Sequence, residues 1–151
     1  MKVANILAAK DPRVITIRPS DTIGALCERL RDQRIGAAIV SSDGQAVEGV
    51  ITERDVTYGL AVHTSDLYAL PVSALMTTTV ITCSPSEKVS LVASTMLARN
   101  IRHIPVVESK PLVGMISIRD VLNWRVNELQ QETGGLRAFA SLRDRNGPMD
   151  R

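Results

Sequence analysis

Two short stretches of the sequence carry the same ordered set of polar side chains: a hydroxyl residue, one variable residue, an arginine and an aspartate. The first is Thr52-Glu53-Arg54-Asp55, and the second is Ser117-Ile118-Arg119-Asp120. A carboxylate accepts hydrogen bonds from vicinal hydroxyl groups, and a guanidinium near a helix N-terminus attracts phosphate. The set therefore suits a ligand that contains a sugar and a phosphate.

The same side chains also have a structural interpretation. Thr52 and Ser117 can cap helices, the two aspartates can stabilise helix dipoles, and the arginines can be solvated charges on a helix face. Capping does not exclude ligand contact, so both interpretations of the hydroxyl residues stay open. Because the aspartate recurs inside a longer repeat, we favour a binding role for it.

A short apolar run that opens with a glycine precedes each polar set. These runs are Gly49-Val50-Ile51 and Gly114-Met115-Ile116, and each is typical of a buried strand. The hydroxyl residue then stands at the carboxyl end of the strand, where a helix is expected to begin. Each polar set is therefore predicted to lie at a strand-to-helix corner.

A longer repeat surrounds the two corners. The segment 14–20 matches 80–86 and the segment 34–40 matches 100–106, both at a spacing of 66 residues. Apolar residues at helical spacing fall between these segments in both copies. Each unit reads as strand, helix, strand, turn, strand, helix, and the helices are predicted at 22–33, 53–62, 87–99 and 118–130.

Composition limits the class of protein. The chain has 151 residues, of which 44% are hydrophobic and 3% aromatic, so aliphatic side chains must fill the core of one domain or two small ones. The net charge of +2 provides no strongly basic face for nucleic acid. The sequence shows no apolar run of the roughly 18 residues that a membrane span needs and no secretory leader, so we expect a soluble, cytoplasmic protein.

Residues for catalysis or metal binding form no recognisable constellation. The chain has only two histidines, His63 and His103, and its two cysteines, Cys27 and Cys83, are far apart. It contains no nucleophile motif and no glycine loop of the phosphate-cradling type. We therefore expect no enzyme activity, no metal site and no disulfide.

The two repeats resemble a tandem pair of CBS (cystathionine-β-synthase-type) domains, also called a Bateman module. The resemblance rests on the repeat and on its ending, Gly-hydrophobic-x-Thr/Ser-x-x-Asp, and it spans about Val3 to Asn127. It implies an α/β (α+β) fold with two βαββα-like repeats related by a pseudo-two-fold axis. We expect repeat 1 at 1–63, repeat 2 at 64–130, and at 131–151 a C-terminal tail that is partly disordered or packs a short helix on a partner.

The resemblance also implies which residues line two clefts between the repeats. In the family the aspartate binds ribose, the hydroxyl residue and the arginine lie near phosphate, and adenine packs on the first strand of the opposite repeat. One cleft is expected to comprise Val14, Ile15, Arg102, His103, Met115, Ser117, Arg119 and Asp120. The other is expected to comprise Gly36, Ala37, Val50, Thr52, Arg54, Asp55, Val80 and Ile81. The cationic residues make the Asp120 cleft the predicted stronger phosphate site. The contribution of Lys10, in a three-residue insertion, stays open.

The function implied by the resemblance is regulatory, of the energy-sensing kind, and not enzymatic. The expected ligand is an adenine nucleotide, AMP first and ADP or ATP next, with NAD(H) or S-adenosylmethionine as alternatives and no catalytic cofactor. The protein is expected to act in trans on an unknown protein effector or through its own assembly as a disc-like homodimer. No membrane or nucleic-acid partner is expected. The alternative is a structural or interaction protein with vestigial clefts.

Overall fold

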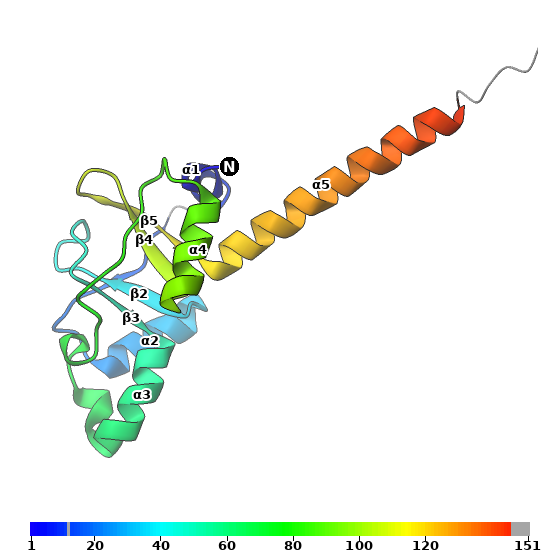
Figure 1. Cartoon of the computed structure of the whole chain (residues 1–151). Helices are drawn as coiled ribbons and strands as arrows, with labels where there is room; N and C mark the ends of the chain where they lie inside the picture. Colours follow the sequence, from blue (N-terminus) through cyan, green and yellow to red (C-terminus); the bar gives the residue numbers. More distant parts are fainter. Residues whose placement is uncertain (12, 146–151) are drawn as a thin grey trace, which may run out of the picture.

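The computed structural model describes residues 1–11 and 13–145, with side chains up to Gln131, as a body of two α+β units from which one long helix projects (Figure 1). The elements follow in the order α1 (Val3–Ala8), β1 (Thr16–Ile17), α2 (Ile23–Gln33), β2 (Ala37–Val40), β3 (Gly49–Thr52), α3 (Glu53–His63), the 3-10 helices η1 (Thr64–Ala69) and η2 (Val72–Ala74), α4 (Val89–Arg99), β4 (His103–Val107), β5 (Leu112–Ser117) and α5 (Ile118–Arg145).

Each unit is built on a small sheet. In the first, β1 runs parallel to β2, and β2 pairs antiparallel with β3 so that Ala37 lies opposite Thr52. In the second, β4 pairs antiparallel with β5, and the counterpart of β1 is reduced to a single parallel bridge between Cys83 and Val106. The predicted α+β class with two βαββα-like repeats is therefore confirmed, although the first strand of each repeat is shorter than the sequence pattern indicates.

Helices α2 and α4 stop in the same way. Helix α2 ends at Arg34, with φ of 53°, and α4 ends at Asn100, the equivalent residue of the second repeat, with φ of 52°. Both residues adopt the left-handed conformation that commonly closes a helix. The chain can then turn back into β2 or β4, which brings the strand start close to the cleft between the units.

The short segments that lead into the repeats are exchanged between them. The N–H of Val3 donates to the carbonyl of Glu87 at 2.9 Å, and the N–H of Val72 donates to the carbonyl of Asp21 at 2.7 Å. Val3 is buried in the core of the second repeat with Val89, Met96, Ile104 and Ile116, and Val72 is buried in the core of the first with Ile17, Ile23, Leu26 and Ile51. Each repeat therefore depends on the lead-in that precedes the other. The division of the chain at residue 63 stays a prediction.

The last helix is longer than the sequence indicates. Its predicted end near Gln130 is wrong, since α5 continues through Gly134 and Gly135 to Arg145. The partly disordered tail stays a prediction. A glycine costs a helix about 1 kcal/mol relative to alanine, and the good helix formers after Gly135 offset that cost. The alternative prediction, a short helix that packs on a partner through Ala138, Phe139 and Leu142, concerns side chains outside the described residues.

Candidate functional site

The two predicted strand-to-helix corners have the same geometry. The N–H and hydroxyl of Thr52 both donate to Oδ2 of Asp55 at 2.8 Å, and the N–H of Asp55 donates back to the hydroxyl at 3.3 Å. The N–H and hydroxyl of Ser117 donate to Oδ2 of Asp120 at 2.7 and 2.9 Å, with a return bond of 3.2 Å. Both hydroxyl residues are therefore helix caps. The caps also fix the two carboxylates at the cleft between the repeats.

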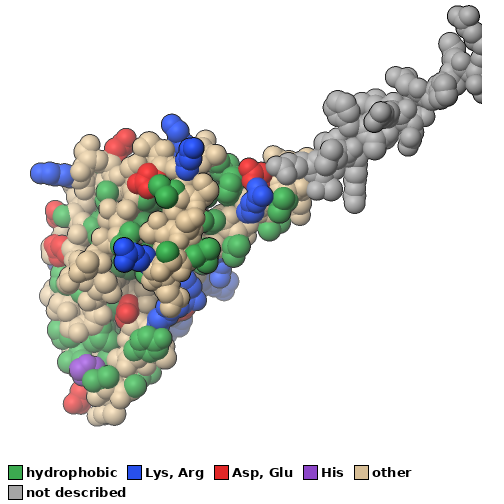
Figure 2. Space-filling model, viewed as in Figure 1, with side chains coloured by type: hydrophobic (Ala, Val, Ile, Leu, Met, Phe, Trp, Pro, Cys, Tyr) green, Lys and Arg blue, Asp and Glu red, His purple; other side chains and the backbone are tan. Residues whose placement is uncertain are grey.

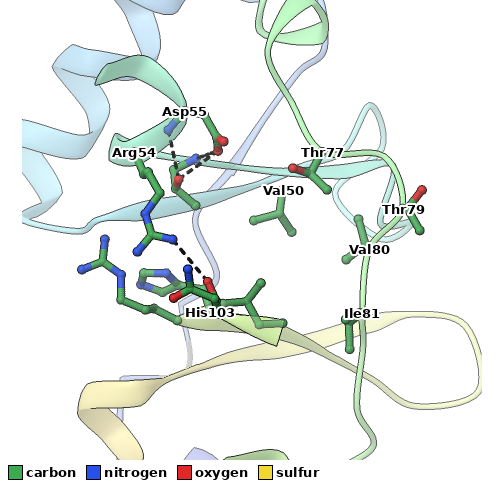
Figure 3. Close-up of a pocket in the computed structure, with 12 residues that line it drawn as sticks. Val50, Arg54, Asp55, Thr77, Thr79, Val80, Ile81 and His103 are labelled. Atoms are coloured by element: carbon green, nitrogen blue, oxygen red, sulfur yellow. Dashed lines mark hydrogen bonds between the residues drawn. The ribbon is translucent and has the colours of Figure 1, made fainter. Parts of the chain in front are cut away.

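A pocket lies beside Asp55, between the two repeats. From the first repeat it takes Val50, Thr52, Arg54 and Asp55, and from the second it takes Thr77, Thr79, Val80, Ile81, Asn100, Ile101, Arg102 and His103. In Figure 3, the aliphatic side chains of Val50, Val80 and Ile81 lie together on one side, and Arg54 and His103 lie on the other. The pocket therefore combines an apolar wall with polar groups that converge on its opposite side.

Four lining residues of this pocket did not emerge from the sequence: Thr77, Thr79, Asn100 and Ile101. The hydroxyl run Thr77-Thr78-Thr79 stands directly before the predicted strand, and Asn100 stands at the predicted end of a helix. The carbonyl of Asn100 accepts a hydrogen bond of 3.2 Å from the guanidinium of Arg54. This contact joins the two repeats and orients Arg54 along the pocket wall.

The starts of β2 and β4 lie against the opposite repeat, which differs from the predicted grouping. Gly36 and Ala37, assigned with Asp55, line a surface pocket with Asp120. Arg102 and His103, assigned with Asp120 alone, line both that pocket and the one beside Asp55. The carbonyl of Gly36 accepts a hydrogen bond of 3.0 Å from the N–H of Glu53, and that of Arg102 accepts one of 2.9 Å from the N–H of Ile118. Each strand start is therefore bonded to the following helix of its own repeat, and its other side remains for the opposite repeat.

The cleft beside Asp120 is divided by a lysine. The ammonium group of Lys10 donates to Oδ2 of Asp120 and to the carbonyl of Met115, at 2.9 Å in each case. Val14 and Ile15 lie with Met115 in one pocket, while Ser117, Arg119 and Asp120 lie in another, and Lys10 lines both. The three-residue insertion around Ala9-Lys10-Asp11 was the only sequence signal of this difference between the clefts.

Main-chain pairing explains why the two clefts differ. Beside Asp55, Val50 and Thr77 exchange two backbone hydrogen bonds, of 3.0 and 2.9 Å. Those bonds hold the segment that leads to Val80 against β3. At the corresponding place beside Asp120, the carbonyl of Met115 accepts from the side chain of Lys10 instead. The inserted loop therefore substitutes a side-chain cation for a main-chain bridge.

Burial and charge set the ionisation of two residues in this region. Burial is the largest effect on the pKa of His103, and the neighbouring Arg102 acts in the same direction, so this pKa lies below its ordinary value and the imidazole is neutral near pH 7. Burial disfavours the Asp120 carboxylate, but hydrogen bonds from Ser117 and Lys10 together outweigh it, and the pKa of Asp120 is lowered. The cleft therefore contains an ionised aspartate and an uncharged histidine.

Other kinds of site find no support in the described part of the chain. Up to Gln131, no three histidine, cysteine, aspartate or glutamate side chains gather as a metal-binding group. Within the same residues, no helix combines the length and apolar character that crossing a bilayer requires. Arg102 and Glu53 approach across the repeats at 3.4 Å, which is an exposed ion pair and not a catalytic arrangement.

Comparison with known proteins identifies relatives of both repeats. The family model described as the CBS domain matches residues 4–61 and 72–127. The mitochondrial CBS domain-containing protein CBSX3 of Arabidopsis thaliana is 34% identical over 123 residues, which cover 79% of this chain and 60% of the relative. The match therefore spans less than two thirds of that relative.

Solved structures share the fold. A CBS-domain containing protein of Agrobacterium tumefaciens, ATU1752, is 33% identical with a TM-score of 0.79, over 83% of this chain and 99% of its own. The protein PAE2072 of Pyrobaculum aerophilum, complexed with AMP, is 29% identical with a TM-score of 0.71, over 80% and 89%. The CBS domain pair of protein MJ0100, complexed with 5′-methylthioadenosine and S-adenosyl-L-methionine, is 25% identical with a TM-score of 0.75, over 85% and 98%.

Proposed function

Because this chain belongs to the CBS-domain family, we propose that it is a regulatory protein that binds an adenine nucleotide between its two repeats. The observation that carries the proposal is the pocket in which Asp55 and Arg54 of one repeat lie across from Val80 and Ile81 of the other. Related CBS pairs were solved with AMP, 5′-methylthioadenosine and S-adenosyl-L-methionine, which share an adenosine group. The proposal assigns no catalytic step to this chain.

Each part of an adenine nucleotide has a matching group in the Asp55 pocket. The base packs on Val50, Val80 and Ile81, because aliphatic side chains take an aromatic ring out of water. The ribose hydroxyls donate to Asp55, whose Oδ2 is already fixed by the cap and whose position is therefore set before binding. The phosphate is bound by Arg54, near the N-terminus of α3.

We propose the Asp55 pocket as the nucleoside site, in place of the predicted stronger site beside Asp120. That prediction relied on Arg102, His103 and Arg119, and the first two of these residues also line the Asp55 pocket. The position beside Asp120 is occupied by the ammonium group of Lys10. No such cation contacts Asp55 among residues 1–11 and 13–131, where this carboxylate accepts hydrogen bonds from Thr52 alone.

Regulation follows from a ligand that contacts both repeats. A nucleotide that binds one arrangement of the repeats more tightly increases the population of that arrangement. We propose that this change acts in trans, on a protein effector or through assembly with a second copy. Large apolar side chains are exposed on three helices and suit such a partner: Tyr58, Leu60 and Val62 on α3, Leu91 and Leu97 on α4, and Leu122 and Val126 on α5. Figure 2 shows hydrophobic side chains at several places on one face of the surface.

Calorimetric titration of the purified full chain tests the proposal. AMP, ATP, NADH and S-adenosylmethionine are titrated separately, with GMP and ribose 5-phosphate as controls for the base. We expect at least one adenosine ligand to bind with a dissociation constant below about 1 mM and both controls to bind more weakly. A chain that binds none of the adenosine ligands below the millimolar range contradicts the proposed function.

One observation favours a second candidate, an interaction protein whose clefts no longer bind ligand. Lys10 fills one of the two clefts from within the chain, as a vestigial cleft would be filled. This candidate predicts that the oligomeric state, measured by analytical ultracentrifugation, is the same with and without every adenosine ligand. The first proposal predicts that a bound ligand changes either that state or the capture of an effector.

A further inference from the structure

The carboxylate of Asp120 accepts more hydrogen bonds from within the chain than that of Asp55 does. Oδ2 of this carboxylate accepts three hydrogen bonds, two from Ser117 and one from Lys10, whereas Oδ2 of Asp55 accepts only the two from Thr52. Lys10 also lies between Asp120 and the apolar residues Val14 and Ile15, which line a different pocket. A nucleoside therefore cannot place its base on Val14 and its ribose on Asp120 while Lys10 keeps its two hydrogen bonds.

The same region is nevertheless rich in cations. The pocket beside Asp120, which we call the phosphate annex, is lined by Lys10, Arg31, Arg34, Arg102 and Arg119. Figure 2 shows Lys and Arg side chains near the start of α5, where this annex lies. The annex is therefore suited to an anion but not to a second nucleoside.

Ion pairs leave two of these cations available. Lys10 pairs with Asp120 at 2.9 Å, Arg31 with Asp32 at 2.9 Å, and Arg102 with Glu53 at the longer distance of 3.4 Å.

Arg34 and Arg119 have no ion pair among residues 1–11 and 13–131. A guanidinium makes two parallel hydrogen bonds to phosphate oxygens, so these two side chains are the natural contacts for an incoming polyphosphate.

The phosphate annex adjoins the Asp55 pocket. Arg102 and His103 line both, and the guanidinium of Arg54 lies on their side of the Asp55 pocket, where it donates to Asn100. A phosphate chain that leaves an adenosine on Asp55 passes Arg54 and reaches Arg102 next. Beyond Arg102 it enters the annex, where Arg119 lies.

We infer that the chain binds one adenosine triphosphate, with its adenosine in the Asp55 pocket and its terminal phosphates in the phosphate annex. The inference rests on the proposed function, since it uses the same Asp55 pocket. It adds that ATP is preferred over AMP and that each chain binds a single nucleotide. Arg119 binds the terminal phosphate, which favours ATP over AMP. Lys10 closes the second cleft, which limits each chain to one nucleotide.

Calorimetric titration of the full chain with AMP and with ATP, without added divalent metal, tests the inference. Wild type is expected to bind one nucleotide per chain, with ATP about tenfold tighter than AMP because of added charge-assisted hydrogen bonds. Arg119→Ala is expected to lower ATP affinity about tenfold and leave AMP affinity unchanged. Arg99→Ala removes the same charge from the exposed end of α4, outside both pockets, and is expected to change neither affinity.

Lys10→Ala supplies an independent readout. Removing the ammonium group frees Asp120, so AMP stoichiometry is expected to rise from one to two per chain. Two AMP molecules per wild-type chain, equal affinities for AMP and ATP, or equal effects of Arg119→Ala and Arg99→Ala on ATP would overturn the inference and leave the proposed function standing. Failure of AMP and ATP to bind would overturn the inference, and failure of NADH and S-adenosylmethionine to bind as well would overturn the proposed function with it.

Discussion

The ammonium group of Lys10 lies 2.9 Å from Oδ2 of Asp120, and these two residues come from opposite ends of the chain. The equivalent aspartate of the first repeat, Asp55, has no cation within such a distance among the described residues. The pseudo-symmetry of the two corners is therefore broken at the carboxylate that would bind a sugar. Under the proposed function, this difference leaves a nucleoside pocket beside Asp55 and a basic annex beside Asp120.

Lys10→Ala should destabilise the chain without any ligand present. The ammonium group is partly buried and makes one charged and one neutral hydrogen bond, so we expect a loss of about 0.5–1.5 kcal/mol in the free energy of unfolding. Urea unfolding followed by circular dichroism measures this loss. Lys110→Ala, in an exposed turn, is the matched control and should change stability by less than about 0.5 kcal/mol. Equal stabilities of the two variants would show that the contact is not stabilising.

His103 should make the fold less stable in mild acid. Burial lowers its pKa in the folded chain, while the unfolded chain keeps a pKa near 6.5. As the pH falls, the unfolded state therefore takes up the proton first. The contribution of His103 to the free energy of unfolding is fully present above pH 6.5 and is lost progressively between pH 6.5 and the pKa of the folded state. Urea unfolding at several pH values, compared between wild type and His103→Gln, isolates this contribution. A wild-type His103 whose NMR titration midpoint exceeds 6.5 would contradict it.

The internal repeat accounts for how much of the fold was predictable. Matching segments 66 residues apart predicted helices that begin within two residues of those observed, because periodicity and caps such as Thr22 and Thr52 are local signals. The contacts between the repeats were not predictable in the same way. The side of the cleft that Arg102 faces depends on how two sheets pack, and Lys10 lies in an insertion with no counterpart in the second copy.

The exchanged lead-in segments should make α1 essential to the second repeat and not to the first. Val3 is fully buried among residues of the second core, so Val3→Ala should cost about 1–3 kcal/mol. Hydrogen exchange should increase more in α4 than in α2. Val62→Ala, at a position that is 75% exposed, is the control and should change stability by no more than about 0.5 kcal/mol. A larger increase in exchange at α2 would contradict the exchanged arrangement.

Cys83 should resist alkylation in the folded chain. Burial, with a smaller contribution from Glu87, raises the pKa of this thiol to about 12, and the side chain lies in the second core. Since the thiolate is the reactive form, iodoacetamide near neutral pH should modify the half-buried Cys27 first and Cys83 only after unfolding. Mass spectrometry of digested, time-resolved samples locates the modified residue. Native labelling of Cys83 at the rate of Cys27 would show that the second core opens readily.

AMP binding to Asp55→Ala and to Asp120→Ala shows which of the two carboxylates holds the ribose. Both variants remove one carboxylate that caps a helix, so they serve as controls for each other's effect on the corner. AMP affinity is measured by calorimetry on each purified full chain that retains the wild-type circular dichroism spectrum. We expect Asp55→Ala to lose about 1.5–3 kcal/mol of binding free energy, the scale of hydrogen bonds to a charged group, and Asp120→Ala to lose little. A large loss in Asp120→Ala with unchanged affinity in Asp55→Ala would contradict this expectation.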